Sequence, residues 1–499
     1  MRARKLYNTC IFFVITQFAV ASHDYNILSF GAVPDGKTLN TKAIQAAINL
    51  AHKEGGGRVI IPAGRFLSGS IVLKSDVELH LLKQAVLLGS VNPDDYLKMN
   101  RWKALVMADS ANNIAISGKG VLDGQGAQLA LTIDSLFYAG KIDSSEYELN
   151  EKRPTCHLRP QIIEFLNCKN IRVTGVTIKN AACWVQTYEL CRNLIIDNIK
   201  VESDAYWNND GIDISNCKSV QITHSYINSS DDGICLKSYC KNPKIESQYC
   251  DSIYISDCTV RSSASAIKLG TPSCGGFKNI TIENIKIFDT FRSAIALELV
   301  DDGVMENIMI NNITAKNTGN AIFIRLGDRR KQEPVGQIKN ITIKNMKVKV
   351  PFERADYAYE IRGPELPYFH NIFPSSITGI PEQPIENIHL ENIEIIYPGG
   401  GNPAYANMPL WRLKDVPEVK DQYPEFSMFG ELPAWGMYVR HVKGLTLKNV
   451  KIKIEKRDYR PALVFDDVKN LSIELLKIEG DKKKDLIIFN SVEELKIIK

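Results

Sequence analysis

The sequence has no long apolar run outside its first 21 residues, so only that segment is a candidate to enter a membrane. Basic residues at positions 2 to 5 precede the apolar run 10–21, which ends in the small-x-small motif Ala19-Val20-Ala21. This order is typical of a cleaved secretory signal. About a dozen apolar residues are too few for the ~20 that span a bilayer. We therefore predict a signal peptide at residues 1–21, no membrane insertion, and a secreted or periplasmic protein.

The sequence also carries little net charge. Its 61 Lys and Arg residues exceed its 57 Asp and Glu residues by only four, and the basic residues form no block. Proteins that bind nucleic acid concentrate basic charge on one face or segment. The charge pattern therefore argues against a nucleic-acid partner. We expect a monomer that needs no cofactor and no metal.

Residues 22–90 form an opening segment whose pattern differs from that of the rest of the chain. After a short strand and a Gly/Pro/Asp turn, apolar residues at 43, 44, 47, 48 and 51 recur at helical spacing. Asn40 or Thr41 is placed to cap this helix, and glycines 55–57 end it. Short strands come next. Because a solenoid needs its terminal apolar face covered, we predict that residues 22–90 are an N-terminal cap.

Beyond this segment one pattern returns throughout the chain, approximately x-[KE]-N-[ILV]-x-[IL]-x-N-[IV]-x-[IV]. Copies start at Cys168, Cys191, Cys217 and Cys250, which are 23, 26 and 33 residues apart. Alternating Ile and Val indicate strands with one buried face, and Asn suits left-handed corners. A unit of this length cannot bury its own apolar face, so the units must stack. We predict an all-β, right-handed parallel β-helix that forms a single domain over residues 22–499.

Two other repeat architectures fit less well. Propeller blades are longer, about 40 residues, and carry signatures absent here, and leucine-rich repeats have a helical half. Ten cysteines lie after residue 21, all between Cys156 and Cys274, and export permits disulfides whose pairing the sequence leaves open. Cysteines 168, 191, 217 and 250 share one repeat position, which favours a column of small buried side chains over a disulfide staple.

Two long interruptions, residues 351–384 and 396–440, break the repeat. They are rich in Pro, Gly and aromatic residues. Loops of this length within a solenoid are usually functional. The aromatic residues Tyr357, Tyr405, Trp411 and Trp435 are candidates to stack on sugar rings, with simple packing onto the coils as the alternative.

Three acids lie in two Asp-Gly clusters, Asp210 in NNDGIDI and Asp231 and Asp232 in SSDDGICLKS. Asp210 and Asp231 are 21 residues apart, close to one repeat. Successive coils are roughly 4.8 Å apart, so acids one repeat apart become neighbours on one surface. Crowded carboxylates repel one another, which raises one pKa toward neutrality, and such a set is what acid/base cleavage of a glycosidic bond requires.

These clusters, one repeat apart and behind this opening segment, resemble glycoside hydrolase family 28, the polygalacturonase-like pectinases. The resemblance covers most of the chain from Tyr25 to the last repeats. It implies an inverting hydrolase of pectic polysaccharides or oligosaccharides. It further implies Asp231 as the general acid for the leaving oxygen, and Asp210 and Asp232 as the pair that positions and deprotonates the water.

Two motifs of that family are missing. Its Gly-His-Gly would fall near residues 264–266, which read Ala-Ser-Ala, and its Arg-Ile-Lys would fall near residues 296–298, which read Ala-Leu-Glu. Lys268, Arg292 and Arg325 are candidates to supply substrate-binding cations from shifted positions.

Glu298 takes the place of a family lysine and is a fourth candidate substrate contact. An acid that faces a substrate carboxylate repels it. The sequence therefore predicts a substrate with a neutral sugar at this point, as in rhamnogalacturonan-type pectin.

Two other functions remain open from the sequence. A pectate-type polysaccharide lyase on the same scaffold would use bound calcium and an Arg or Lys base, and would leave an unsaturated product. A non-catalytic carbohydrate-binding β-helix would bind sugar without releasing new reducing ends.

Overall fold

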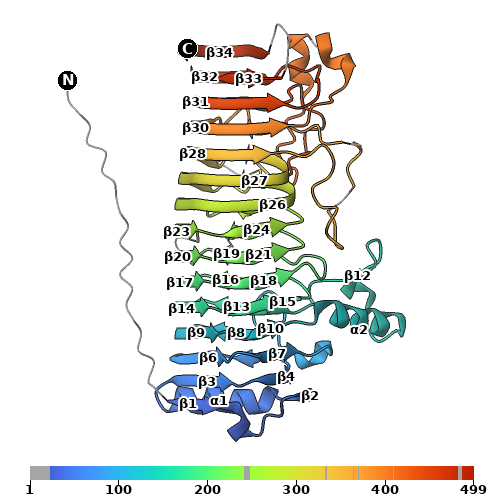
Figure 1. Ribbon diagram of the computed structural model, residues 1–499, viewed down its shortest axis with the longest axis vertical. Helices are drawn as coiled ribbons and strands as arrows, with labels where there is room; N and C mark the ends of the chain where they lie inside the picture. Colours follow the sequence, from blue (N-terminus) through green and yellow to red (C-terminus); the bar gives the residue numbers. More distant parts are fainter. Residues whose placement is uncertain are drawn as a thin grey trace, which may run out of the picture.

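Each sequence repeat forms one coil of a right-handed parallel β-helix, which confirms the predicted fold class (Figure 1). The computed structural model describes residues 23–240, 248–331, 334–363, 365–368, 370–407, 409–480 and 486–498. The predicted signal at 1–21 lies outside these residues. None of the described helices is long and apolar enough to cross a membrane.

The strands stack into three faces, numbered in the order in which each coil visits them. The first face contains β1 (Asp24–Asn26), β3 (Gly57–Ile61), β6 (Val77–Leu81), β9 (Asn112–Gly118), β14 (Lys169–Thr174), β17 (Arg192–Asp197), β20 (Lys218–Thr223) and β23 (Cys250–Ser256). The second contains β2 (Asp35–Leu39), β4 (Gly64–Ser68), β7 (Ala85–Gly89), β10 (Val121–Asp123), β15 (Thr177–Lys179), β18 (Lys200–Ser203), β21 (Tyr226–Ser229), β24 (Thr259–Ser262) and β33 (Lys477–Glu479).

The third face carries the predicted acids. It contains β5 (Ile71–Val72), β8 (Ala104–Asp109), β13 (Gln161–Leu166), β16 (Gln186–Glu189), β19 (Ile212–Ser215), β22 (Ile234–Ser238), β25 (Ile267–Ser273) and β29 (Ser375–Thr378). Later strands bend across more than one face: β26 (Phe277–Leu299), β27 (Val304–Leu326), β28 (Gln337–Lys349), β30 (Ile385–Tyr397), β31 (Met437–Ile454), β32 (Leu463–Glu474) and β34 (Ile487–Ile498).

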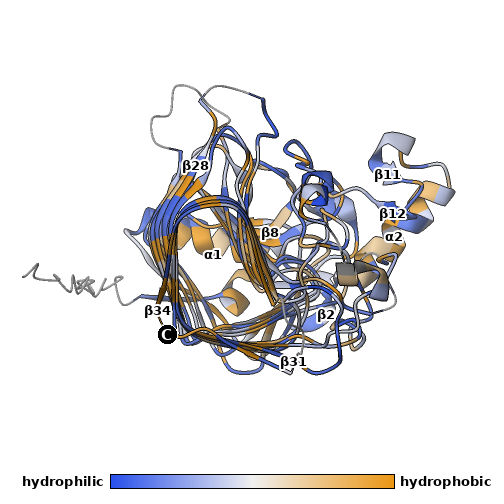
Figure 2. Ribbon diagram, turned by 90° about the horizontal axis from the view of Figure 1, so that it is seen from above, coloured by the Kyte–Doolittle hydropathy of each residue, from blue (hydrophilic) through white to orange (hydrophobic). Residues whose placement is uncertain are grey.

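Alternation along each strand sends Ile, Val and Leu into one continuous core inside the coils. Figure 2 looks along the stack of coils, with apolar residues of the ribbon in orange. At the corners, asparagines adopt the left-handed conformation, with φ values such as 55° at Asn113 and 56° at Asn170. Their amides form ladders between coils, since Asn170 donates to Asn113 and Asn193 donates to Asn170, each at 2.9 Å. The predicted role of the repeated Asn is confirmed.

The cysteine column is buried as predicted. Cysteines 168, 191, 217 and 250 are free thiols inside the core. A disulfide instead joins Cys240 to Cys274, outside the shared repeat position. The four cysteines at the shared repeat position therefore form no disulfide.

The predicted cap helix is α1 (Thr41–Lys53), which lies across the first coils. Ile44, Ala47, Ile48 and Ala51 are fully buried against the core. Asn40 stands at the N-cap position, but its side chain bonds the backbone of Val33 and Thr38 instead of the helix. Short 3₁₀ turns lie at η1 (Ile27–Phe30), η2 (Pro93–Asp95), η3 (Ser144–Glu146), η4 (Pro403–Asn407) and η5 (Leu410–Asp415).

Three long insertions leave the coils at the same corner, the turn from the second face to the third. Residues 124–160 separate β10 from β13, residues 350–374 separate β28 from β29, and residues 398–436 separate β30 from β31. The first insertion, which the repeat pattern did not indicate, holds α2 (Gly126–Tyr138) and the hairpin of β11 (Tyr147–Glu148) and β12 (Arg153–Pro154). In Figure 1 the insertions project from the right side of the stack.

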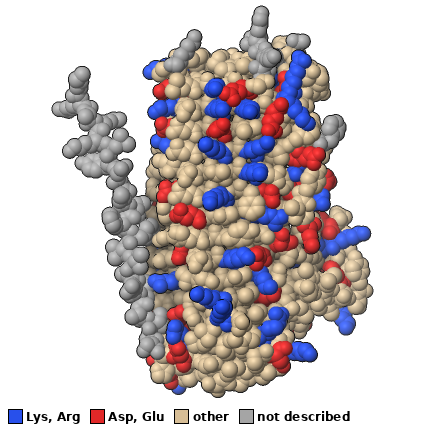
Figure 3. Space-filling view, viewed as in Figure 1, with Lys and Arg blue, Asp and Glu red and all other residues tan. Residues whose placement is uncertain are grey.

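The other two insertions correspond to the predicted interruptions, with two differences. The prediction placed residues 375–378 in a loop, whereas they form β29 and pair with β27 and β31. It also placed residues 396–397 and 437–440 in a loop, whereas they belong to β30 and β31. The charged side chains on the face in Figure 3 are interspersed, without a continuous basic patch.

Replacing Ile48 tests the cap. Ile48→Asp puts a carboxylate into a fully buried site, so we expect a loss of at least about 3 kcal/mol of unfolding free energy, together with aggregation. Ala46→Asp, on the exposed side of the same helix, is the matched control and should melt like the native protein. Thermal melting with light scattering is the measurement. Equal melting of the two variants would contradict a packed cap.

Candidate active site

The three predicted acids lie at the corner where the chain enters the third face. Asp210 precedes β19, and Asp231 and Asp232 precede β22. Ile212 pairs with Ile234, and the N–H of Gly211 donates to the carbonyl of Asp232. The step between these coils is therefore 22 residues, not the predicted 21. Asp210 thus stacks on Asp232, and Asp231 lies at the more exposed position beside them.

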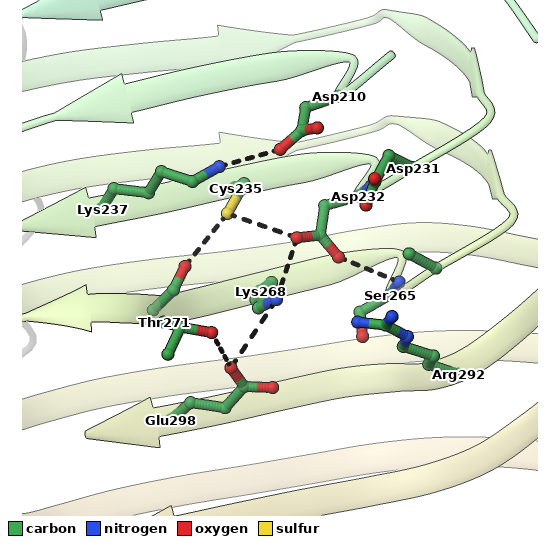
Figure 4. A network of polar contacts seen from close by, with 12 residues as sticks. Asp210, Asp231, Asp232, Cys235, Lys237, Ser265, Lys268, Thr271, Arg292 and Glu298 are labelled. Atoms are coloured by element: carbon green, nitrogen blue, oxygen red, sulfur yellow. Dashed lines mark hydrogen bonds and ion pairs between the residues drawn. The ribbon is translucent and has the colours of Figure 1, made fainter. Parts of the chain in front are cut away.

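The coil stacking brings the three carboxylates together (Figure 4). One oxygen of each lies within 4.8 Å of the others. Asp210 and Asp232 are each 4% exposed, whereas Asp231 is partly exposed. The backbone N–H of Asp232 donates to Oδ1 of Asp231 at 2.9 Å. This bond orients the Asp231 carboxyl group and leaves its second oxygen available.

A buried lysine on β22 neutralises one side of the cluster. The Nζ atom of Lys237 lies 2.9 Å from Oδ2 of Asp210 and also contacts Asp213 on β19. The same ammonium group lies 4.0 Å from the ring centre of Trp184. The sequence analysis singled out neither Lys237 nor Asp213. The available signal was their alternation with Ile212, Ile214 and Leu236, which places them on the outer side of the third face.

A second buried lysine contacts acids on the coils before and after its own. The Nζ atom of Lys268, on β25, lies 3.0 Å from Oδ2 of Asp232, 3.1 Å from the Tyr423 hydroxyl and 3.7 Å from Oε2 of Glu298. Lys268 is 1% exposed. Its charge therefore serves the acids from within the protein and is not presented on the surface.

Glu298 is also held inside the network. Its Oε2 accepts a hydrogen bond of 2.8 Å from Thr271, and the residue is 2% exposed. Burial raises the pKa of Glu298 to about 7, against the opposing effect of Lys268. The repulsion expected between Glu298 and a substrate carboxylate is therefore weakened, because the carboxyl group points to Lys268 and Thr271 (Figure 4).

The two predicted arginines have different surroundings. Arg292, on β26, lies 2.9 Å from Oε1 of Glu425 in the third insertion. Its charge opposes the rise in the pKa of Asp231 and contributes to the lowered pKa of Asp232. Arg325, on β27, donates to the backbone carbonyls of Gly379 and Glu418 at 3.2 and 2.6 Å. The structure thus brings Lys268, Glu298 and Arg292 to the acids, whereas Arg325 anchors a loop.

The surroundings of Asp231 and Asp232 shift the pKa values of these two neighbouring acids in opposite directions. Burial and the charge of Asp232 raise the pKa of Asp231. Burial also acts to raise the pKa of Asp232, but Lys268, Lys237 and Arg292 outweigh it and lower that pKa. Two adjacent carboxyl groups thus have pKa values shifted apart, which is the difference that a division between acid and base roles needs.

The acids that contact Lys237 both have raised pKa values. Burial, together with the neighbouring acids, raises the pKa of Asp210 against the attraction of Lys237, and burial raises that of Asp213 to about 6. Burial alone would lower the pKa of Lys237, but Asp210 and Asp213 keep it well above its usual value. The lysine therefore keeps its charge.

The three acids are also a candidate cation site, since each offers one carboxylate oxygen. Ca²⁺ takes six to eight oxygen ligands. Two of these carboxylates already face an ammonium group, Asp210 that of Lys237 and Asp232 that of Lys268. A divalent ion would have to compete with both lysines, so the donor set fits calcium poorly.

The aromatic candidates in the insertions divide into two kinds. Trp435 is 1% exposed and packs on Tyr397 in the core, as the packing alternative predicted. Trp411 and Tyr357 are 62% and 53% exposed. The side chain of Tyr405 lies outside the described part of the chain.

Comparison with known proteins identifies the family of this chain. The model of glycosyl hydrolases family 28 matches residues 53–349, more than half of the 499 residues. The chain belongs to glycosyl hydrolase family 28. This family 28 chain is therefore a glycoside hydrolase.

Individual relatives are distant. The family 28 chain is 25% identical over 465 residues to a probable polygalacturonase of Vitis vinifera, covering 83% of this chain and 84% of that protein. It is similar to an exopolygalacturonase structure from Thermotoga maritima, with a TM-score of 0.60 and 26% identity over 75% of this chain and 87% of the other. A family 28 exopolygalacturonase from Yersinia enterocolitica shares the fold, with a TM-score of 0.61 and 19% identity over 95% of this chain and 78% of the other.

Removing the buried lysine tests the charge network. Lys237→Met leaves Asp210 and Asp213 buried without their ammonium group, and breaking a buried pair in this way costs about 3–5 kcal/mol. Lys200→Met, which removes a half-exposed lysine paired with Glu202, should cost less than about 1 kcal/mol. Urea unfolding at neutral pH is the measurement. A native-like Lys237→Met would show that the pairing contributes little.

Proposed function

We propose that this family 28 enzyme hydrolyses α-glycosidic, galacturonate-type linkages in pectic polysaccharides or oligosaccharides, with inversion at the anomeric carbon. The observation that carries the proposal is the carboxyl cluster, in which the pKa of Asp231 is raised beside an ionised Asp232. Family membership and the polygalacturonase relatives support the reaction class.

Each acid has a role that depends on its surroundings. Asp231 is the general acid, because it is the most exposed of the three and its pKa is raised above the usual value by burial and by the charge of Asp232. It donates that proton to the leaving glycosidic oxygen. Asp232 and Asp210 hold a water molecule, and Asp232, whose pKa is lowered, accepts the proton of that water as it attacks the anomeric carbon. Lys237 and Lys268 keep these two carboxylates in place.

The spacing of the carboxylates does not by itself support an inverting mechanism. Inverting glycosidases commonly separate their carboxyl groups by about 6.5–9.5 Å, whereas the oxygens nearest one another here lie within 4.8 Å. Inversion is therefore proposed from the family resemblance. The anomeric form of the first product, followed by proton NMR during the reaction, distinguishes it from retention.

A lyase has less support. Its calcium would have to displace the two ammonium groups from the acids. Its product would absorb ultraviolet light because it contains a new carbon–carbon double bond, whereas hydrolysis adds only reducing ends.

The substrate proposal rests on the protein carboxylates that the cations near the acids already contact. Lys268 is buried between Asp232 and Glu298, and Arg292 is paired with Glu425. Both charges are thus balanced by protein carboxylates. A neutral sugar next to the cleaved galacturonate linkage, as in rhamnogalacturonan-type pectin, needs no further cation.

We include in the proposal that the enzyme is exported through its predicted signal at 1–21 and acts as a monomer.

Changing the acids one at a time tests the assignment. Asp231→Asn should keep the fold and lower kcat by about 10²–10⁴-fold, because it removes general acid catalysis. Asp210→Asn and Asp232→Asn should also be severe, since they remove the water-activating pair. Asp134→Asn, in the insertion 124–160, is the matched control and should retain full activity. Reducing-end release from pectic oligosaccharides is the measurement. Near-native rates in all three site variants would contradict the assignment of these acids as catalytic.

Substrate preference is measured separately. We expect kcat/KM for rhamnogalacturonan oligosaccharides to exceed that for oligogalacturonates of equal length, because a second carboxylate would meet no unbalanced cation. A clear preference for oligogalacturonate would refute the neutral-sugar proposal and leave the hydrolase assignment standing.

A further inference from the structure

A pocket of about 220 Å³ lies where the second insertion meets the coils. Its wall includes Phe291 and Gly319 from the coil corners, Phe426 from the third insertion, and Tyr357 and Glu365 from the second. Tyr357 is 53% exposed and the side chain of Glu365 is 83% exposed, so that rim opens to solvent.

The pocket adjoins the acids on the C-terminal side. Phe291 directly precedes Arg292, and Phe426 is the next residue after Glu425, the partner of Arg292. The N–H of Arg292 donates to the carbonyl of Ala264, whose coil lies directly after that of Asp231. The pocket wall thus begins two coils from Asp231, which is roughly 10 Å at about 4.8 Å per coil. A bound oligosaccharide reaches it by extending past the cleaved bond.

The lining combines apolar rings with polar edges. Phe426 packs edge-to-face on both Phe291, at 6.0 Å, and Phe373, at 5.0 Å. Tyr368 and Asn371 complete the wall beside Tyr357. Ring surfaces that offer hydroxyl and amide groups at their margins suit a sugar, which has an apolar face and a hydroxyl-bearing edge.

The charges of the lining disfavour an acidic ligand. Arg354 binds both carboxylate oxygens of the buried Asp356, at 2.9 and 2.8 Å, and its Nη1 lies 3.2 Å from Glu365. One guanidinium group therefore faces two carboxylates. Arg354 and Glu365 balance each other within the lining, and Arg354 is already engaged by two carboxylates, so the pocket offers a uronate no uncommitted arginine, whereas a neutral sugar needs none.

We propose that this pocket binds a neutral glycosyl residue of the substrate, a hexose or 6-deoxyhexose, on the C-terminal side of the cleavage point. The inference rests on the proposed function, because it takes the substrate to be a pectic chain. It also deepens that function, since it identifies the residues that select a neutral sugar at a distance from the acids.

Binding is measured by calorimetry in the Asp231→Asn background, which prevents turnover. The probes are an oligosaccharide of alternating galacturonate and rhamnose and an oligogalacturonate of equal length. Tyr357→Ala should weaken binding of the mixed oligosaccharide about tenfold, the effect of losing roughly 1.4 kcal/mol of ring contact. Tyr138→Ala removes another exposed aromatic side chain, outside the pocket, and should change neither affinity.

A second variant tests the charge argument. Glu365→Gln should raise affinity for the oligogalacturonate severalfold and leave that for the mixed oligosaccharide unchanged, because it removes one of the two carboxylates. If Tyr357→Ala binds both probes like Tyr138→Ala, or if Glu365→Gln leaves the preference unchanged, the pocket assignment is overturned.

The two proposals fail in different ways. If the native enzyme hydrolyses pectic oligosaccharides while both pocket variants behave like the control, only the pocket assignment is lost. If the native enzyme hydrolyses none of them while the pocket variants change binding as expected, the pocket assignment stands and the proposed reaction is lost.

Discussion

The structure depends on the stacking of one coil directly on the next through parallel backbone hydrogen bonds. Stacking gives every residue a neighbour one coil away at about 4.8 Å, whatever its distance along the chain. Inside the coils this produces columns of Ile, Val and Leu, and at the corners it produces ladders of Asn. On the outside it places Asp210 against Asp232 and thus creates the site. The same geometry that stabilises the fold concentrates charge of one sign.

That concentration is tolerable only because buried cations alternate with the acids. Lys237 stands between Asp210 and Asp213, and Lys268 stands between Asp232 and Glu298. A buried ion pair contributes little net stability, but losing one partner is costly. The lysines therefore act by lowering the pKa of the carboxyl groups that they contact, an effect that outweighs burial at Asp232 but not at Asp210. Asp231 has no such direct partner among the described ion pairs, and burial and the charge of Asp232 raise its pKa.

Much of this site was predictable, and the misses have identifiable causes. The Asp-Gly clusters identified the acids, yet the 21-residue spacing indicated the wrong neighbour because these two coils are 22 residues apart. Lys268 and Arg292 were selected as cations, and both lie at the acids. Lys237 went unnoticed because a single lysine in a strand has no motif, although its alternation with buried residues marked it as outward-facing. Glu298 was expected to face substrate, but burial and Thr271 turned it inward.

The sequence by itself determined the fold class, the cap helix and the identity of the three acids. These features depend on local patterns, namely strand alternation, helical spacing and turn residues, that recur with the coil. Only the tertiary structure decided which side chains from distant segments complete the site. Lys268 meets Tyr423 across 155 residues, and Arg292 meets Glu425, because the insertions leave the coils at the corner that carries the acids. The repeat pattern does not specify how a long irregular loop folds back onto the coils. The contacts that shift the pKa values of the site residues therefore form only once the coils have stacked.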